Sequence, residues 1–186
     1  VGTGDYSLEL DGSSSSADLG NQFTNNIVTI EFNFKPAQLI DDNNPEPQAL
    51  IFRDTPNQAD EFGFYIGPNN WQGEEGKLVF SIMDNGTKHI AVSDQNAWNP
   101  NLWYHVAGVY DFQNGMRLYI NGQLQTSTGP NAMAVLGSTY PTVLGKWGAS
   151  NIRYFEGKMD NVRFWSDIRT TQEISNNQNT CLSGTE

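Results

Sequence analysis

Apolar and polar residues alternate with a period of two along most of this 186-residue chain. Successive side chains of a β-strand point to opposite faces, so this period predicts strands with one face in a core. Helical periodicity is almost absent. The alternating, β-branched and aromatic runs predict strands at Tyr6–Leu10, Ile27–Phe34, Ala49–Arg53, Phe62–Ile66, Lys77–Met83, His89–Ser93, Trp103–Asp111, Arg117–Ile120, Thr142–Leu144 and Gly157–Trp165.

Turn and cap signals separate these runs. The pairs Asn114-Gly115 and Asn121-Gly122 supply the positive φ angles of tight hairpin turns. One short helix is predicted at Thr171–Asn177, because Thr170 and Glu173 have the spacing of a capping box. Two long polar connections, at Asp41–Gln48 and Pro68–Gly76, are of the kind that often carries function.

The length suits a single all-β domain, which we expect to span residues 1–186. Neither repeats nor a change of composition divide the chain. It begins Val-Gly-Thr-Gly, without Met, so we expect a mature form or a domain of a larger secreted protein. Cys181 is the only cysteine, which rules out an internal disulfide.

The charge balance excludes two classes of partner. With 21 acidic and 10 basic residues, the formal net charge is −11. Nucleic acids and anionic membrane surfaces demand clustered Lys and Arg, so we expect neither as a partner. No apolar run approaches the roughly 18 residues of a membrane-spanning helix, so membrane insertion is not expected.

Four segments carry a resemblance to a known family: Tyr6–Gly12, Ile27–Pro36, Trp103–Gly122 and Phe155–Arg169. They resemble the laminin-G-like jelly-roll family of the concanavalin A-like lectin/glucanase folds. The resemblance implies an all-β, two-sheet antiparallel jelly-roll sandwich, here with one short C-terminal helix, in a secreted or cell-surface protein. Because this fold hosts enzymes, lectins and adhesion modules, function has to be argued from sites.

The same resemblance implies a structural Ca²⁺ that ties the first strand region to the last. Asp11 and Asp160 are the residues that match its ligands. Calcium takes six to eight oxygen ligands, which need not be close in sequence. The alternatives are a turn-opening role for Asp11 and a loop hydrogen bond for Asp160.

A carboxylate mechanism is incomplete in this sequence. Retaining glycosidases of related fold use a strand motif Glu-x-Asp-x-x-Glu, whose carboxylates lie on one face. Glu9 and Asp11 match its first two positions, but Ser14 stands at the third. Neither His89 nor His105 has a metal-binding spacing, and we expect His105 to make a structural hydrogen bond. We therefore expect no enzyme.

Tryptophans in irregular loops are the candidate ligand contacts. Trp71, Trp98 and Trp147 lie among Gly, Asn and Pro residues, where an indole either anchors a loop or stacks on the C–H face of a sugar. Arg153 and Tyr154, close to Trp147 in sequence, are candidates for the accompanying polar contacts. Trp103 and Trp165 fall within predicted strands and match core positions of the resembled family, so we assign both to packing.

We therefore predict a non-catalytic, carbohydrate-binding module for a polysaccharide or glycan. A protein-interaction or adhesion module is the second hypothesis, and a large apolar patch on one sheet face would favour it. A polysaccharide hydrolase or lyase is the third, and it requires two facing carboxylates at catalytic separation.

Overall fold

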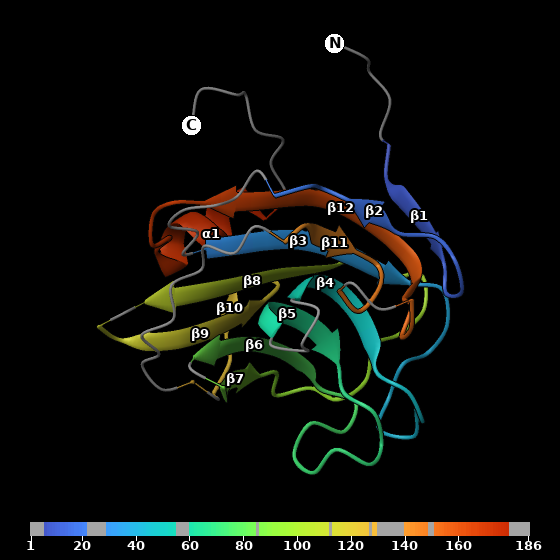
Figure 1. Cartoon of the computed structure of the whole chain (residues 1–186). Helices are drawn as coiled ribbons and strands as arrows, with labels where there is room; N and C mark the ends of the chain where they lie inside the picture. Colours follow the sequence, from blue (N-terminus) through green and yellow to red (C-terminus); the bar gives the residue numbers. More distant parts are fainter. Residues whose placement is uncertain are drawn as a thin grey trace.

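Two antiparallel six-stranded sheets pack face to face in the computed structural model of the chain (Figure 1). The structure describes residues 6–21, 29–54, 60–84, 86–111, 113–126, 128–129, 140–148 and 151–178. In spatial order, the first sheet contains β1 (Leu8–Asp11), β12 (Glu156–Trp165), β3 (Thr29–Pro36), β8 (Tyr104–Asp111), β9 (Gly115–Ile120) and β10 (Gln123–Leu124). The second contains β2 (Ala17–Asp18), β11 (Thr142–Leu144), β4 (Gln48–Asp54), β5 (Asp60–Ile66), β6 (Leu78–Asp84) and β7 (Thr87–Val92).

The predicted fold class is confirmed, and every predicted strand and the helix correspond to an observed element within a few residues. The short strands β2 and β10 were not predicted, since two residues carry no detectable period. The first two residues of the strand predicted at Ile27–Phe34 lie outside the described residues, as does Cys181.

Aromatic side chains from both sheets fill the space between them. Phe64 and Phe80 stack with ring centroids 4.6 Å apart, and Phe32 meets Phe64 edge-on at 5.1 Å. Gly108 on β8 leaves room for this stack, because a Cβ atom there would lie 2.5 Å from the Phe64 ring. The absence of a side chain at Gly108 therefore allows the aromatic rings to pack closely against β8.

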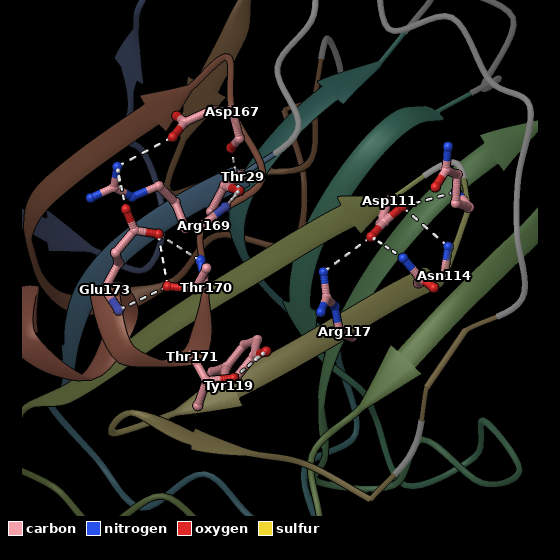
Figure 2. Close-up of polar contacts among 11 residues, drawn as sticks. Thr29, Asp111, Asn114, Arg117, Tyr119, Asp167, Arg169, Thr170, Thr171 and Glu173 are labelled. Atoms are coloured by element: carbon pink, nitrogen blue, oxygen red, sulfur yellow. Dashed lines mark hydrogen bonds and ion pairs between the residues drawn. The ribbon is translucent and has the colours of Figure 1, made fainter.

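Helix α1 (Thr171–Asn177) covers part of the outer face of the first sheet. Its one buried residue, Ile174, packs with Ala107, Val109 and Tyr119. The predicted capping box is present, since Thr170 and Glu173 each bond the other's backbone N–H (Figure 2). No helix among the described residues is long and apolar enough to cross a membrane.

The two hairpin turns of the first sheet follow from short polar residues. At the end of β8, the Asp111 carboxylate accepts hydrogen bonds from the backbone and side-chain amides of Asn114 and pairs with Arg117 (Figure 2). Between β9 and β10, Asn121 and Gly122 have φ angles of 49° and 74°. Two successive positive φ values match the twist of a two-residue hairpin, as predicted.

Candidate ligand-binding site

The outer face of the second sheet carries aromatic side chains. Alternation along β5 sends Phe64 into the inter-sheet core and its neighbour Tyr65 outward. Phe52 on β4 and Val79 on β6 point the same way as Tyr65 and form a separate buried cluster with it. This face therefore has an apolar floor.

Two loops each add a tryptophan above this floor. Trp71 comes from the connection between β5 and β6, and Trp147 from the connection between β11 and β12. The centroid separations are 5.3 Å for Tyr65–Trp147, 5.7 Å for Tyr65–Trp71 and 6.0 Å for Trp71–Trp147. These separations are typical of stabilising aromatic pairs. We call Tyr65, Trp71 and Trp147 the outer aromatic cluster; its two tryptophans are partly exposed.

Backbone contacts hold both loops in place. The Glu74 N–H donates to the Trp71 carbonyl at 2.9 Å, and the Trp147 N–H donates to the Ile152 carbonyl at 3.2 Å. Gly148 has a φ of 45°, and a Cβ atom there would lie 2.2 Å from a side-chain carbon of β4. Glycine is thus required for the close approach that seats Trp147 on the sheet.

Two cations lie over the outer aromatic cluster. The Arg153 guanidinium carbon is 4.5 Å from the Trp147 ring centroid and 5.4 Å from that of Trp71. On β7, the Lys88 ammonium is 5.1 Å from the Tyr65 centroid and 5.5 Å from that of Trp71. The negative faces of the rings attract such cations, which in turn stabilise the ring arrangement.

A buried carboxylate engages one of these cations. Glu74 accepts a hydrogen bond from the Tyr65 hydroxyl at 2.6 Å and another from the Lys88 ammonium at 2.9 Å. Glu74 thereby fixes the positions of both side chains and compensates the charge of Lys88. Charged groups of this kind make the stronger hydrogen bonds of a protein.

A polar pocket of about 580 Å³ adjoins the cluster, and Arg153 belongs to both. Its lining also includes Tyr154 and Asn151 from the loop of Trp147, and Glu46 and Gln48 from the start of β4. Amide, carboxylate and hydroxyl groups such as these donate to and accept from ligand hydroxyls. The arrangement is an aromatic surface bordered by polar groups.

Sequence comparison places the fold in a family. A laminin-G-type family profile, described as the concanavalin A-like lectin/glucanases superfamily, matches residues 11–175. The chain belongs to this superfamily. The match reaches from the end of β1 into α1, so it includes both sheets of this concanavalin A-like domain. No curated protein sequence matches the chain.

Several solved structures share the fold of the concanavalin A-like domain. Domain 4 of AbnA, a GH43 extracellular arabinanase from Geobacillus stearothermophilus in complex with arabinotriose, has 18% identity and a TM-score of 0.68, over 91% of this chain and 75% of that one. The CBM40 of Ruminococcus gnavus IT-sialidase bound to α2,3-sialyllactose has 17% identity and a TM-score of 0.64, over 94% and 97%. The receptor binding domain of botulinum neurotoxin D has 16% identity and a TM-score of 0.68, over 92% and 45%.

The structure brings together four of the predicted ligand contacts, namely Trp71, Trp147, Arg153 and Tyr154. Their binding of a ligand stays a prediction. Trp98 is different, because its side chain is 0% exposed and its indole N–H donates to the Gly76 carbonyl at 2.9 Å. Trp98 anchors a loop in the core, so its assignment as a ligand contact is wrong.

The core assignment of Trp103 and Trp165 is also wrong. Trp103 is 43% exposed on the outer side of the first sheet, where the Lys35 ammonium lies 5.1 Å from its ring centroid. Trp165 is partly exposed, and the Arg169 guanidinium carbon lies 4.2 Å from its ring centroid. Both rings therefore lie outside the inter-sheet core and partner cations.

The two carboxylates matched to calcium do not meet. Asp11 lies opposite Glu156, and Asp160 lies four residues further along β12, about 13 Å away at the rise of a strand. The Asp11 carboxylate is already occupied by hydrogen bonds from residues 13–15. Within the described residues no three His, Cys, Asp or Glu side chains gather in a metal-binding group. The Asp11–Asp160 site is wrong, and calcium binding as such stays a prediction.

The remaining candidates for chemistry have structural partners. Glu9, on the edge strand β1, lies 3.8 Å from the Lys158 ammonium, and its side chain is 78% exposed. His105 is buried on β8 with Nε2 3.3 Å from Oε2 of Glu31, which is the structural contact predicted for it. The absence of catalysis stays a prediction.

Sequence reasoning missed Tyr65, Lys88 and Glu74. The alternation along β5 contained a signal for Tyr65, because Tyr65 lies between Phe64 and Ile66, which both point into the core. No comparable signal identified Lys88 or Glu74. Glu74 meets Tyr65 and Lys88 because the β5–β6 connection folds back beside β5 and β7, and the alternation within a strand does not reveal this folding.

Proposed function

We propose that this domain is a non-catalytic carbohydrate-binding module of a secreted or cell-surface protein, and that the outer aromatic cluster with its adjoining pocket is the binding site. A sugar offers apolar C–H faces to aromatic rings and hydroxyl groups to planar polar side chains. Trp71 and Trp147 supply the rings, and Gln48, Asn151 and Arg153 supply the polar groups.

The observation that carries this proposal is the position of Trp71. Its ring is partly exposed, yet Tyr65 and Trp147 hold it edge-on at 5.7 and 6.0 Å. A ring held this way loses little conformational freedom when a ligand binds, which lowers the entropic cost of binding. The same side chain lies under Arg153, a residue of the polar pocket.

The structural neighbours support a carbohydrate ligand. The AbnA domain is solved in complex with arabinotriose, and the CBM40 is bound to α2,3-sialyllactose. The first is part of an extracellular arabinanase and the second is part of a sialidase, and both names denote enzymes that act on glycans.

The test is a glycan array followed by titration calorimetry with each glycan that binds. We expect weak binding to isolated oligosaccharides and stronger binding to multivalent display. Replacing Trp71 with Ala removes the exposed ring, so affinity should fall by about tenfold or more. Trp71→Phe, which keeps a stacking ring, should retain more affinity than Trp71→Ala.

Trp103→Ala is the matched control, because it removes an exposed tryptophan from the opposite sheet. Its affinity should equal that of the wild type, and all variants should melt within a few degrees of it. If Trp103→Ala loses binding and Trp71→Ala retains it, the site is wrong. If no glycan binds, the function is wrong.

Exposed apolar side chains favour a protein-interaction module as the second candidate. Leu102 and Trp103 are adjacent in sequence and 53% and 43% exposed. One structural neighbour is a receptor binding domain of a neurotoxin. Crosslinking a purified receptor candidate to wild type but not to Trp103→Ala would support this function over carbohydrate binding.

A further inference from the structure

We propose that the outer aromatic cluster binds a sugar that carries a carboxylate, and that Arg153 is the residue that recognises this carboxylate. This inference rests on the proposed carbohydrate-binding function and specifies the chemistry of its ligand. The contacts of the Arg153 guanidinium differ from those of the other arginines of the domain.

Arg153 differs from every other arginine of this chain. The chain has five arginines, and four of them lie within 4 Å of a carboxylate: Arg53 with Glu61, Arg117 with Asp111, Arg163 with Glu31, and Arg169 with Asp167 and Glu173. For Arg153, no carboxylate partner and no side-chain hydrogen bond exists within the described part of the chain. In a protein of net charge −11, an arginine without an acid is the exception.

The guanidinium of Arg153 is nevertheless held in place. It lies over Trp147 and Trp71, with 4.5 and 5.4 Å from its central carbon to the ring centroids. A guanidinium is planar, and its N–H donors point outward in that plane. A guanidinium that lies over a ring makes no N–H···O hydrogen bond there, so its donors remain available to a ligand.

The backbone at Arg153 is also specialised. Its φ angle is 57°, a left-handed conformation that is uncommon for residues other than Gly, Asn and Asp. The Arg153 carbonyl accepts a hydrogen bond from the Ala49 N–H of β4 at 3.1 Å, which ties this strained residue to the sheet. Strained backbone that neighbouring contacts hold fixed is concentrated at ligand sites.

Lys88, the other cation over the cluster, is not available to a ligand carboxylate in the same way. Lys88 already pairs with Glu74 at 2.9 Å, so its charge is compensated. Of the two cations over the outer aromatic cluster, Arg153 is therefore the one without a carboxylate partner, and it lies at the border of the polar pocket. A carboxylate matches the guanidinium fork with two parallel hydrogen bonds. Glu46 on the pocket lining can accept hydrogen bonds from sugar hydroxyls, which orients the ligand.

The experiment compares acidic glycans with matched neutral ones. The probes are oligogalacturonate with its carboxyl-reduced form, and sialyllactose with lactose, each titrated at low ionic strength. We expect the wild type to bind at least one acidic probe about tenfold more tightly than its neutral counterpart. A sulfated form of the neutral oligosaccharide is included. It should bind more weakly, because the single charge of a sulfate ester is spread over three oxygens, which accept weaker hydrogen bonds than a carboxylate does.

Three variants assign the preference to Arg153. Arg153→Gln should abolish the preference for the acidic form, whereas Arg153→Lys should keep part of it, since Lys supplies charge without the fork. Lys158→Gln, which removes an exposed cation from the first sheet, should leave the preference unchanged. Equal melting temperatures show that the variants are folded.

The inference is overturned if neutral and acidic forms bind the wild type equally, or if Arg153→Gln keeps the preference. In both cases binding of neutral sugars still supports the proposed function. If the protein binds neither these probes nor any glycan on the array, both this inference and the proposed carbohydrate-binding function are overturned. A stronger response to the sulfated probe than to any carboxylate also contradicts the inference.

Discussion

At the end of β1, Asp11 organises the turn that follows. Its Oδ1 accepts hydrogen bonds from the backbone N–H groups of residues 13–15 at 2.8 to 2.9 Å, and the Ser14 hydroxyl donates to Oδ2 at 2.6 Å. All four bonds favour the ionised form. The Ser14 hydroxyl, followed by the amides, therefore holds the pKa of Asp11 far below its ordinary value of 3.8.

This pKa shift predicts how stability depends on pH. Because the folded-state pKa of Asp11 lies below the unfolded value of about 3.9, its contribution is complete above that pH and is lost as the pH falls toward the folded value. Asp11→Asn lacks this contribution. Its melting temperature should be lower than that of the wild type at pH 7, and the gap should narrow below about pH 4.

Circular dichroism melts between pH 3 and 7 measure this gap. Glu9→Gln is the control. It removes another exposed carboxylate of the same strand, but one that does not organise a turn. A gap that is constant over the whole range would contradict the assigned role of Asp11.

Single residues also show how far the sequence alone could predict the burial of tryptophans. Tyr104 and Val106 point into the core, so the strand period places Trp103 on the outer face with His105. This information was present in the sequence, and the family resemblance obscured it. Trp98 is different, because its burial depends on a bridge to Ile40, which no local pattern reveals.

Among the elements, α1 depends most on contacts beyond its own sequence. A helix of seven residues is too short to be stable alone. Ile174 gives it an apolar contact with β8 and β9, and the capping box satisfies free N–H groups at its start (Figure 2). The sequence predicted this helix from the capping box, which is a local signal, whereas the packing of Ile174 on the sheet was not predicted.

Thr170→Ala should reduce the free energy of unfolding by about 1 kcal/mol, since it removes the side chain that accepts the Glu173 N–H. Urea unfolding, with the m-value compared between proteins, measures the change. Thr170→Ser keeps the hydroxyl and should be close to the wild type. Equal stability of the Ala variant and the wild type would show that the cap does not contribute.

For the whole molecule, the two outer faces of the sandwich have different environments. Helix α1 covers part of the first sheet's outer face (Figure 1). The second sheet's outer face carries the outer aromatic cluster instead. The order of strands could be expected from the resemblance, but the meeting of Trp71 and Trp147 could not. Two loops far apart in the sequence converge there, because Trp147 packs on Phe52 and Tyr65 of neighbouring strands and Trp71 packs on the same Tyr65.

The net charge of −11 predicts an unusual salt dependence for an acidic glycan. The molecule as a whole repels such a ligand over tens of ångströms, while Arg153 attracts it only at contact. Raising the ionic strength from about 0.01 M to about 0.15 M shortens the screening length from about 30 Å to about 8 Å, which weakens the long-range repulsion more than the contact. The association rate, measured by surface plasmon resonance, should therefore rise about twofold or more with salt. Lactose and other neutral probes should show no such change. An association rate that falls with salt would contradict this prediction and would mean that the local field of Arg153 governs the encounter.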